Sequence, residues 1–238
     1  MPDTVVVIPA WNEEANLPDV IAEVRAALPD VDVLVVDDGS TDDTAGVAGA
    51  AGAHVVSLGE NKGLRIGIAT CYREAFDRGY AYCGRVDADG QHPPAELGRL
   101  LAMVRGDECD VAIGSRFAEG EGYEQGRYVP SRARRLGIKL LQTAVHVRLG
   151  HEFRDPGSGM AAVNRKAMPV LAEPYRSGAP EVEALLRLNR DGLRVVEVPV
   201  EMRERASGHS RLRGGKAVKL VLTVTGTLLF FRWMRRRG

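Results

Sequence analysis

The sequence has few cysteines, and their number does not suit a disulfide framework. Cys71, Cys83 and Cys109 are the three cysteines of the 238 residues. Small secreted domains that depend on disulfides use dense, even sets of cysteine, and metal-binding cysteines are usually closely spaced. We therefore expect three reduced thiols that pack inside a cytoplasmic protein.

An excess of charge of one sign is also missing. The chain has 32 Lys and Arg residues against 32 Asp and Glu residues, which gives a formal net charge of zero. Nucleic-acid-binding domains are usually basic, so we expect no nucleic-acid partner. Basic residues nevertheless gather in the stretches 127–150 and 203–238. These stretches predict an anionic acceptor or surface on that side of the protein.

No apolar run is long enough to cross a bilayer, and no secretory leader precedes the first predicted strand. The longest such run covers residues 220–231, whereas a spanning helix needs about 20 residues. Residues 217–234 are flanked by Lys216 and Lys219 before and by Arg235–Arg237 after, which is typical of a helix lying in the interface of an anionic membrane. Alternatively, this helix packs on its own domain or on a second subunit, as in a homodimer. We expect a cytoplasmic protein in peripheral contact with the inner face of the membrane.

Strand-like and helix-like segments alternate through the first half of the chain. Short apolar, β-branched runs bounded by turn residues predict strands at residues 4–8, 32–36, 54–57, 82–86 and 111–114. Segments with helical periodicity, such as 17–28 and 65–78, separate them. This alternation predicts an α/β fold, with a mostly parallel, doubly wound sheet flanked by helices.

In the second half of the chain, strand-like and helix-like segments no longer alternate regularly. This half predicts helices over residues 136–149 and 181–191 and short strands over 160–163 and 194–198. The Gly-rich segment 115–130 predicts a long mobile loop.

Length and continuity indicate one main domain. A chain of 238 residues is near the upper end of what a single hydrophobic core serves, and no internal repeat or linker divides it. We expect one catalytic domain over residues 1–212 and a basic, apolar tail helix over 213–238.

Polar side chains follow four of the predicted strands. Ligands bind beyond the carboxyl ends of the strands in an open parallel sheet. The residues at these ends are Pro9, Trp11, Asn12 and Glu13, then Asp37, Asp38, Gly39 and Ser40, then Asp87, Ala88, Asp89, Gly90 and Gln91, and finally Ser115 and Arg116. Each also has a structural interpretation, such as a helix N-cap for Asn12 or Ser40. For Asp42 and Asp43 we prefer that interpretation, as acids in the first turn of a helix.

Asp87 and Asp89 are the strongest candidates for a metal site. With Ala88 between them, the two carboxylates of an extended segment point to the same side. Carboxylates gathered at one edge repel each other unless a cation is supplied. Mg²⁺ and Mn²⁺ prefer oxygen ligands and keep positions for phosphate oxygens. The motif, with Gln91 after it, therefore predicts a site for Mg²⁺ or Mn²⁺ and the diphosphate of a nucleotide.

Seven motifs in order resemble the family 2 glycosyltransferases of the GT-A fold. They are IPAWNEE at 8–14, VVDDGSTDDT at 35–44, NKGLRIGIA at 61–69, VDADGQHPP at 86–94, GSRF at 114–117, DPGSGMAAVNRKA at 155–167 and EVPVEMRERASGHSRL at 197–212. The resemblance is strongest to the branch of dolichyl- and polyprenyl-phosphate mannosyltransferases and glucosyltransferases. It implies a metal-dependent, inverting transfer of a hexose from a GDP- or UDP-sugar to a polyprenyl or dolichyl phosphate.

The resemblance also implies a role for individual residues. Those matched to the nucleotide are Pro9, Trp11 and Glu13, Asp37 and Asp38, and Lys62 and Gly63. Asp87, Asp89 and Gln91 match the metal-binding motif, in which Ala88 is the spacer. Arg116 matches an arginine that helps to hold the acceptor phosphate. Arg205, with Gly208, His209 and Ser210, matches the segment that closes over the donor diphosphate.

Two alternatives remain open for the function. A hydroxyl acceptor on a polysaccharide, a protein or a small molecule needs a protein base, and Glu181 or Glu183 is then the candidate; both are equally interpretable as first-turn acids. A non-catalytic nucleotide-sugar-binding subunit is the other alternative. The residues Gly90-Gln91-His92 depart from the branch pattern and leave the acceptor less defined than the donor. His92, His146, His151 and His209 lack ligand spacing and are interpreted as loop or surface residues.

Overall fold

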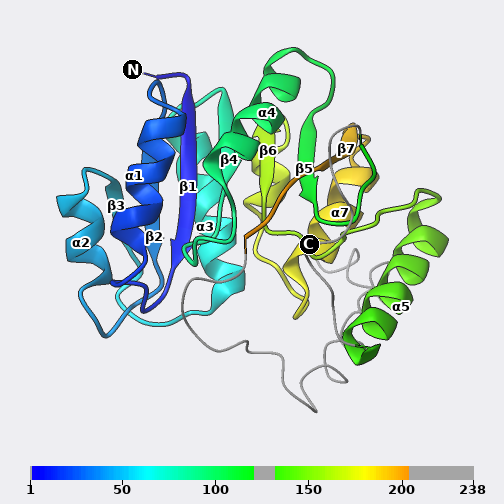
Figure 1. Cartoon of the computed structure of the whole chain (residues 1–238), viewed down its shortest axis with the longest axis horizontal. Helices are drawn as coiled ribbons and strands as arrows, with labels where there is room; N and C mark the ends of the chain where they lie inside the picture. The colour runs from blue at the N-terminus through cyan, green and yellow to red at the C-terminus, as the bar shows by residue number, and fades with distance from the viewer. Residues whose placement is uncertain (1, 121–131, 204–238) are drawn as a thin grey trace.

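A seven-stranded sheet crosses the part of the chain that the computed structural model describes, which is residues 2–120 and 132–203 (Figure 1). The strand order is β3-β2-β1-β4-β6-β5-β7. The strands are β1 (Thr4–Ala10), β2 (Asp32–Asp37), β3 (His54–Ser57), β4 (Tyr82–Arg85), β5 (Val111–Ser115), β6 (Ala161–Asn164) and β7 (Val195–Pro199). The α/β fold predicted from the alternating pattern is confirmed.

The sheet is parallel except at β6. This strand lies between β4 and β5 and pairs with both in the antiparallel direction, whereas the other neighbours are parallel. Ala161, the first residue of β6, is therefore opposite Arg85, the last residue of β4. As a result, the loop that enters β6 reaches the same edge of the sheet as the loops that leave β1, β2, β4 and β5.

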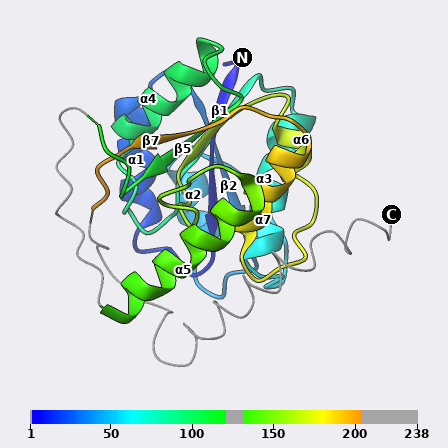
Figure 2. The ribbon, with the colours of Figure 1, turned by 90° about the vertical axis from the view of Figure 1, so that its right-hand side faces the viewer.

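Helices cover both faces of the sheet (Figure 2). One face carries α1 (Leu17–Ala27), α2 (Thr44–Ala50) and α4 (Pro94–Arg105), and the other carries α3 (Leu64–Asp77), α6 (Met168–Leu171) and α7 (Pro180–Arg190). α5 (Arg132–Leu149) lies beside α7 at one end of the molecule. Pro18, Pro94 and Pro180 stand in the first turns of α1, α4 and α7, where the missing N–H removes no helical hydrogen bond.

β1 shows how the sequence produces these layers. Val6 and Ile8 belong to the apolar cluster under α1 and α4, while Val5 and Val7 belong to the cluster under α3 and α6. Side chains alternate between the faces of a strand, so a continuous apolar run fills two cores at once. All seven residues of β1 are buried, as expected for a strand covered by helices on both faces.

The sequence also led to expectations about the cysteines, about membrane-spanning helices and about the tail. Cys71, Cys83 and Cys109 are buried free thiols, as predicted. Within residues 2–120 and 132–203, no helix is both long enough and apolar enough to cross a membrane. The tail helix over 213–238 and the domain boundary at 212 lie outside the described residues, as does most of the loop predicted over 115–130.

Candidate active site

The loops after β1 and β2 are tied together by side-chain to backbone hydrogen bonds. Asn12 donates its N–H to Ser40 Oγ (2.9 Å), and Thr41 donates its N–H to Asn12 Oδ1 (2.8 Å). Asn12 has φ 54°, a conformation that Asn tolerates better than most residues. Glu13 donates its N–H to Thr44 Oγ1 (2.9 Å). Trp11 stays 37 % exposed beside this junction, while Pro9 is buried within β1.

Asp37 and Asp38 brace the neighbouring turn. Asp38 accepts the N–H of Lys62 at Oδ1 and the N–H of Gly63 at Oδ2, both at 2.8 Å. Asp37 accepts the hydroxyl of Ser57 (2.9 Å) and the N–H of Ser40 (3.0 Å). Both acids are buried. Asp38 thus fixes the backbone of the Asn-Lys-Gly turn beside it, whereas Asp37 ties the end of β3 to the loop after β2.

The acidic motif forms a short loop between β4 and α4. Asp89 accepts the N–H of Gln91 at Oδ1 (3.1 Å), and Gln91 donates its side-chain amide to the carbonyl of Arg203 (3.4 Å). Gly90 between them has φ +73°, in the left-handed region that glycine adopts without strain. Ala88 and Asp89 are buried, while the Asp87 side chain is 36 % exposed.

His92 lies in this loop, as one of its two interpretations had it, but it is not a surface residue. It is buried, and its Nδ1 accepts the N–H of Asp87 at 3.0 Å. Burial lowers the pKa of His92 against the opposing influence of Asp87 and Asp89. The neutral ring then carries its proton on Nε2, which lies 4.0 Å from Asp87 Oδ2. His146 and His151, by contrast, are exposed as predicted.

The loop before β6 passes close to the Asp87 carboxylate. A Cβ placed on Gly159 would lie 2.6 Å from Asp87 Oδ2, so only glycine leaves this carboxylate its position. Within the described residues, no three His, Cys, Asp or Glu side chains gather as a complete metal site. Asp87 and Asp89 nevertheless fit Mg²⁺ or Mn²⁺, because these ions bind through one or two carboxylates and take their other oxygens from water and phosphate.

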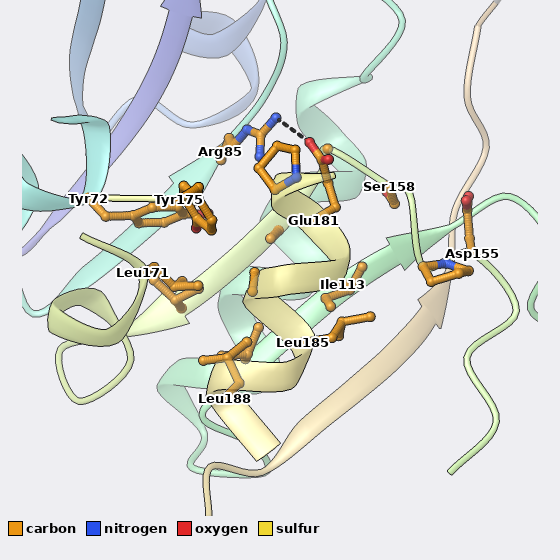
Figure 3. A pocket seen from close by; sticks show the side chains of 17 residues that line it. Tyr72, Arg85, Ile113, Asp155, Ser158, Leu171, Tyr175, Glu181, Leu185 and Leu188 are labelled. Atoms are coloured by element: carbon orange, nitrogen blue, oxygen red, sulfur yellow. Dashed lines mark hydrogen bonds and ion pairs between the residues drawn. The ribbon is translucent and has the colours of Figure 1, made fainter. Parts of the chain in front are cut away.

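A pocket with about 490 Å³ of empty space, part of it open to solvent, lies between the end of β4 and α7 (Figure 3). Arg85 and Glu181 stand at its polar end, with Arg85 Nη2 3.4 Å from Glu181 Oε1 and 3.2 Å from Asp87 Oδ1. Burial raises the pKa of Glu181, while Arg85 acts in the opposite direction. Tyr72 and Tyr175 line the adjoining wall. Arg85 was not singled out from the sequence, although an arginine inside an apolar strand was the available signal.

Arg116 is held by a carboxylate that the sequence did not indicate. Its Nε and Nη2 each donate to Asp155 at 2.7 Å, the planar geometry that suits a carboxylate or a phosphate. Asp155 is buried, and its own N–H donates to Glu197 Oε1 at 2.6 Å. Burial raises the pKa of Glu197. Arg116 therefore lies at the edge of the sheet where a ligand is expected, and its guanidinium is already paired with Asp155.

The structure separates the two candidate bases. Glu181 lines the pocket, with 21 % of its side chain exposed. Glu183 is buried, accepts the N–H groups of Arg176 and Ser177, and pairs with Arg187. These contacts lower the pKa of Glu183 against the effect of burial. Its burial and its pairing with Arg187 favour the interpretation of Glu183 as a structural first-turn acid over a role as base.

Several of the predicted site residues thus lie at one edge of the sheet, beside the turn of Lys62 and Gly63. They are Asp87, Ala88, Asp89, Gln91 and Arg116. Arg205 and Ser210, which were predicted to close over the donor diphosphate, lie outside the described residues. Arg85, His92 and Asp155 join the site from the structure alone.

Comparisons with known proteins identify the family of this chain. The family described as "Glycosyl transferase family 2" matches residues 5–170. A polyprenol monophosphomannose synthase of Mycolicibacterium smegmatis is 32 % identical, over 99 % of this chain and 90 % of the relative. An undecaprenyl-phosphate mannosyltransferase of Micrococcus luteus is 34 % identical, over 95 % of this chain and 94 % of the relative.

Solved structures show the same fold. A glucosyl-3-phosphoglycerate synthase of Mycobacterium tuberculosis, in complex with Mn²⁺, uridine diphosphate and phosphoglyceric acid, superimposes with a TM-score of 0.70 at 24 % identity. The match covers 96 % of this chain and 78 % of that chain. The sheet and its flanking helices are therefore those of the GT-A fold. The extent of the family match and the two mannosyltransferase relatives together show that this chain is a glycosyltransferase and belongs to family 2.

Proposed function

We propose that this enzyme transfers a hexose of the mannose or glucose type from a GDP- or UDP-sugar to a polyprenyl or dolichyl phosphate. The convergence of Asp87, Asp89 and Arg116 at one edge of the sheet carries this proposal. The two relatives described above are named for the transfer of mannose to polyprenyl phosphates. The donor bond from the anomeric carbon to the diphosphate breaks as an acceptor phosphate oxygen forms the new bond, with inversion.

Residues on the proposed donor side would stabilise the diphosphate leaving group. Asp87 and Asp89, with Gln91 nearby, would hold Mg²⁺ or Mn²⁺, which neutralises charge on the diphosphate. The turn of Lys62 and Gly63 is fixed by Asp38, so its backbone is set before the nucleotide arrives. Preset groups are effective because they need no reorganisation during the reaction. Trp11, exposed at the same edge, offers an aromatic face to the nucleoside.

The acceptor side favours a phosphate. A phosphate oxygen is already ionised and needs no protein base. Arg116 presents its guanidinium in the fork geometry that also binds phosphate oxygens. Binding of an acceptor phosphate to Arg116 would exchange one anionic partner, Asp155, for another.

Glu181 supports the alternative of a hydroxyl acceptor. It lies in the pocket beside Asp87, and burial raises its pKa, which suits a general base or acid. Its carboxylate is also bound to Arg85, and this ion pair favours the charged form. We prefer the phosphate acceptor because Glu181 already has this cationic partner.

The acceptor also fixes the place of the reaction. A polyprenyl phosphate is embedded in a membrane, so the enzyme has to reach the headgroup layer. We propose peripheral association with the cytoplasmic face of an anionic membrane, through the basic and apolar tail over 213–238. Basic residues near such a surface contribute about 1 kcal/mol each to binding.

An assay with several donors and two kinds of acceptor tests the proposal. Purified enzyme is incubated with Mn²⁺ or Mg²⁺, labelled GDP-mannose, UDP-glucose or GDP-glucose, and either a short polyprenyl phosphate or a free-hydroxyl acceptor. We expect labelled polyprenyl phosphate product that disappears when the metal is chelated. Asp89→Ala should lower turnover by about 100-fold or more, because the metal and the diphosphate lose a ligand that sets their geometry.

Glu181→Gln is the matched variant for the competing acceptor. Turnover on phosphate should persist in Glu181→Gln, since no proton has to be removed from the acceptor. Transfer to hydroxyl acceptors alone, abolished in Glu181→Gln, would replace the phosphate acceptor by the alternative.

A further inference from the structure

Arg85 is a charged residue in the centre of the sheet. It ends β4, between β1 and β6, and its side chain is only 6 % exposed. Burying a guanidinium is unfavourable unless acids or hydrogen-bond acceptors surround it. The position therefore calls for a reason beyond the packing of β4.

The contacts of Arg85 differ from those of the other deeply buried arginine, Arg187. Arg187 donates to the carbonyls of Glu173 and Pro174 and pairs with Glu183, as a structural arginine does when most of its donors are used. Arg85 instead uses one nitrogen, Nη2, for two carboxylates, at 3.2 Å and 3.4 Å. Its buried Nε has no hydrogen-bond partner among the described residues.

The two carboxylates on Arg85 come from separate parts of the fold. Asp87 leaves the end of β4, and Glu181 stands in the first turn of α7. Their side chains are 36 % and 21 % exposed, and Glu181 lines the pocket together with Arg85. Figure 3 shows the guanidinium reaching across to Glu181 at the polar end of the pocket. Arg85 is only 6 % exposed, so the two acids offer a ligand more surface than Arg85 does.

We propose that Arg85 is a positioning residue, which holds the carboxylates of Asp87 and Glu181 in one fixed arrangement at the metal and diphosphate site. Without it, the two carboxylates that share Arg85 Nη2 would repel each other and turn apart. Gly159 blocks one direction of movement for Asp87, and His92 fixes its backbone N–H. Arg85 adds a constraint on the carboxylate itself. This inference rests on the proposed function, because it assigns a metal ligand to Asp87.

Two opposite effects make the inference testable. Removing a nearby cation strengthens Mn²⁺ binding if only charge matters, because the site becomes more negative. Loss of a group that orients a metal ligand weakens metal binding by about 10- to 100-fold. The sign of the change therefore separates positioning from simple electrostatics.

The experiment measures Mn²⁺ binding directly, by electron paramagnetic resonance, in the presence of UDP or GDP. We expect Arg85→Met to weaken Mn²⁺ binding by about tenfold or more. Arg85→Lys keeps the charge but loses the planar fork, and should give an intermediate loss. Arg85→Met/Glu181→Gln removes the repelling charge as well, so it keeps the test available if Arg85→Met does not fold, and we expect it to bind Mn²⁺ weakly too.

Arg187→Met/Glu183→Gln is the matched control, since it removes a buried arginine and its partner glutamate from the same helix. Thermal unfolding is recorded for every variant, and the control should bind Mn²⁺ as the unaltered chain does. Unchanged or tighter Mn²⁺ binding in Arg85→Met would overturn the inference, as would an equal loss in the control. Failure of the unaltered chain to bind Mn²⁺ with either nucleotide would overturn the proposed function first, and this inference with it.

Discussion

At the scale of single residues, Gly159 controls how closely the loop before β6 approaches Asp87. Its neighbour in the loop, Gly157, has no atom within 4 Å of an added Cβ, whereas a Cβ on Gly159 would lie 2.6 Å from Asp87 Oδ2. A shift of about 1 Å in a catalytic group can lower turnover by about 100-fold. We expect a loss of that order in Gly159→Ala, measured as kcat with saturating donor.

Gly157→Ala is the control for that variant, because it changes the same loop without touching the acidic motif. Its kcat should stay close to that of the unaltered enzyme. Equal activity of the two alanine variants would show that the contact with Asp87 does not matter for turnover.

Some residues of the candidate site could be predicted from the sequence, and others could not. Asp87, Asp89 and Arg116 were predicted because their types and their places after apolar runs already suggest a ligand. Arg85 and Asp155 were missed because they acquire their importance from Glu181 and Arg116, which lie far away in the chain. His92 was missed because its burial cannot be read from the sequence. Asp155, for example, acquires its place only through Arg116, 39 residues earlier.

At the scale of elements, Asp110 joins the three strands around the antiparallel insertion. It precedes β5, accepts the side-chain amide of Asn164 at the end of β6 (2.8 Å), and accepts the N–H of Arg194 just before β7 (2.9 Å). Hydrogen bonds from the Arg194 side chain, the Arg194 backbone and Asn164 lower the pKa of Asp110 to about 2. The acid therefore holds this end of the sheet in its charged form.

The stability of this junction should depend on pH. The unfolded Asp110 binds a proton near pH 3.8 and the folded one near pH 2, so its contribution is complete above about pH 4 and is lost as the pH falls towards 2. We expect Asp110→Asn to lower the free energy of unfolding by about 2 kcal/mol at pH 7. Urea denaturation at several pH values measures the difference, which should shrink in acid. A difference that stays constant down to pH 2 would contradict this account.

The elements themselves were largely predictable. The apolar run 4–8 and the observed Thr4–Ala10 differ by two residues at one end, and the helix predicted over 181–191 is observed as Pro180–Arg190. The direction of β6 was not predicted, because a short apolar run looks the same in parallel and antiparallel strands. The one-turn helix α6 is too short to show a periodicity.

At the scale of the whole molecule, membrane contact remains to be tested. The prediction rests on Lys216, Lys219 and Arg235–Arg237 around the apolar stretch 217–234. We expect the full chain to sediment with vesicles containing anionic lipids, and to be released from them as the salt concentration rises. A chain truncated before Lys216 should stay in the supernatant.

Vesicles made only of zwitterionic lipid are the control for charge. Weak binding to them by the full chain is the expected result, since the basic residues then have no anionic partner. Equal sedimentation of the full and truncated chains would instead favour packing of the tail on protein.

The reversed direction of β6 has an evolutionary consequence. The loops that carry Asp38, Asp87 and Asp89 leave strands within residues 4–91, whereas the segment carrying Asp155 and Gly159 enters its strand from the opposite direction. An insertion in that entering loop lengthens the chain before the ladder of β6 begins and leaves the register of β1, β2 and β4 unaltered. Under the proposed function, we expect insertions near Asp155 and away from Gly159 to change acceptor preference among relatives while the proposed donor side is kept.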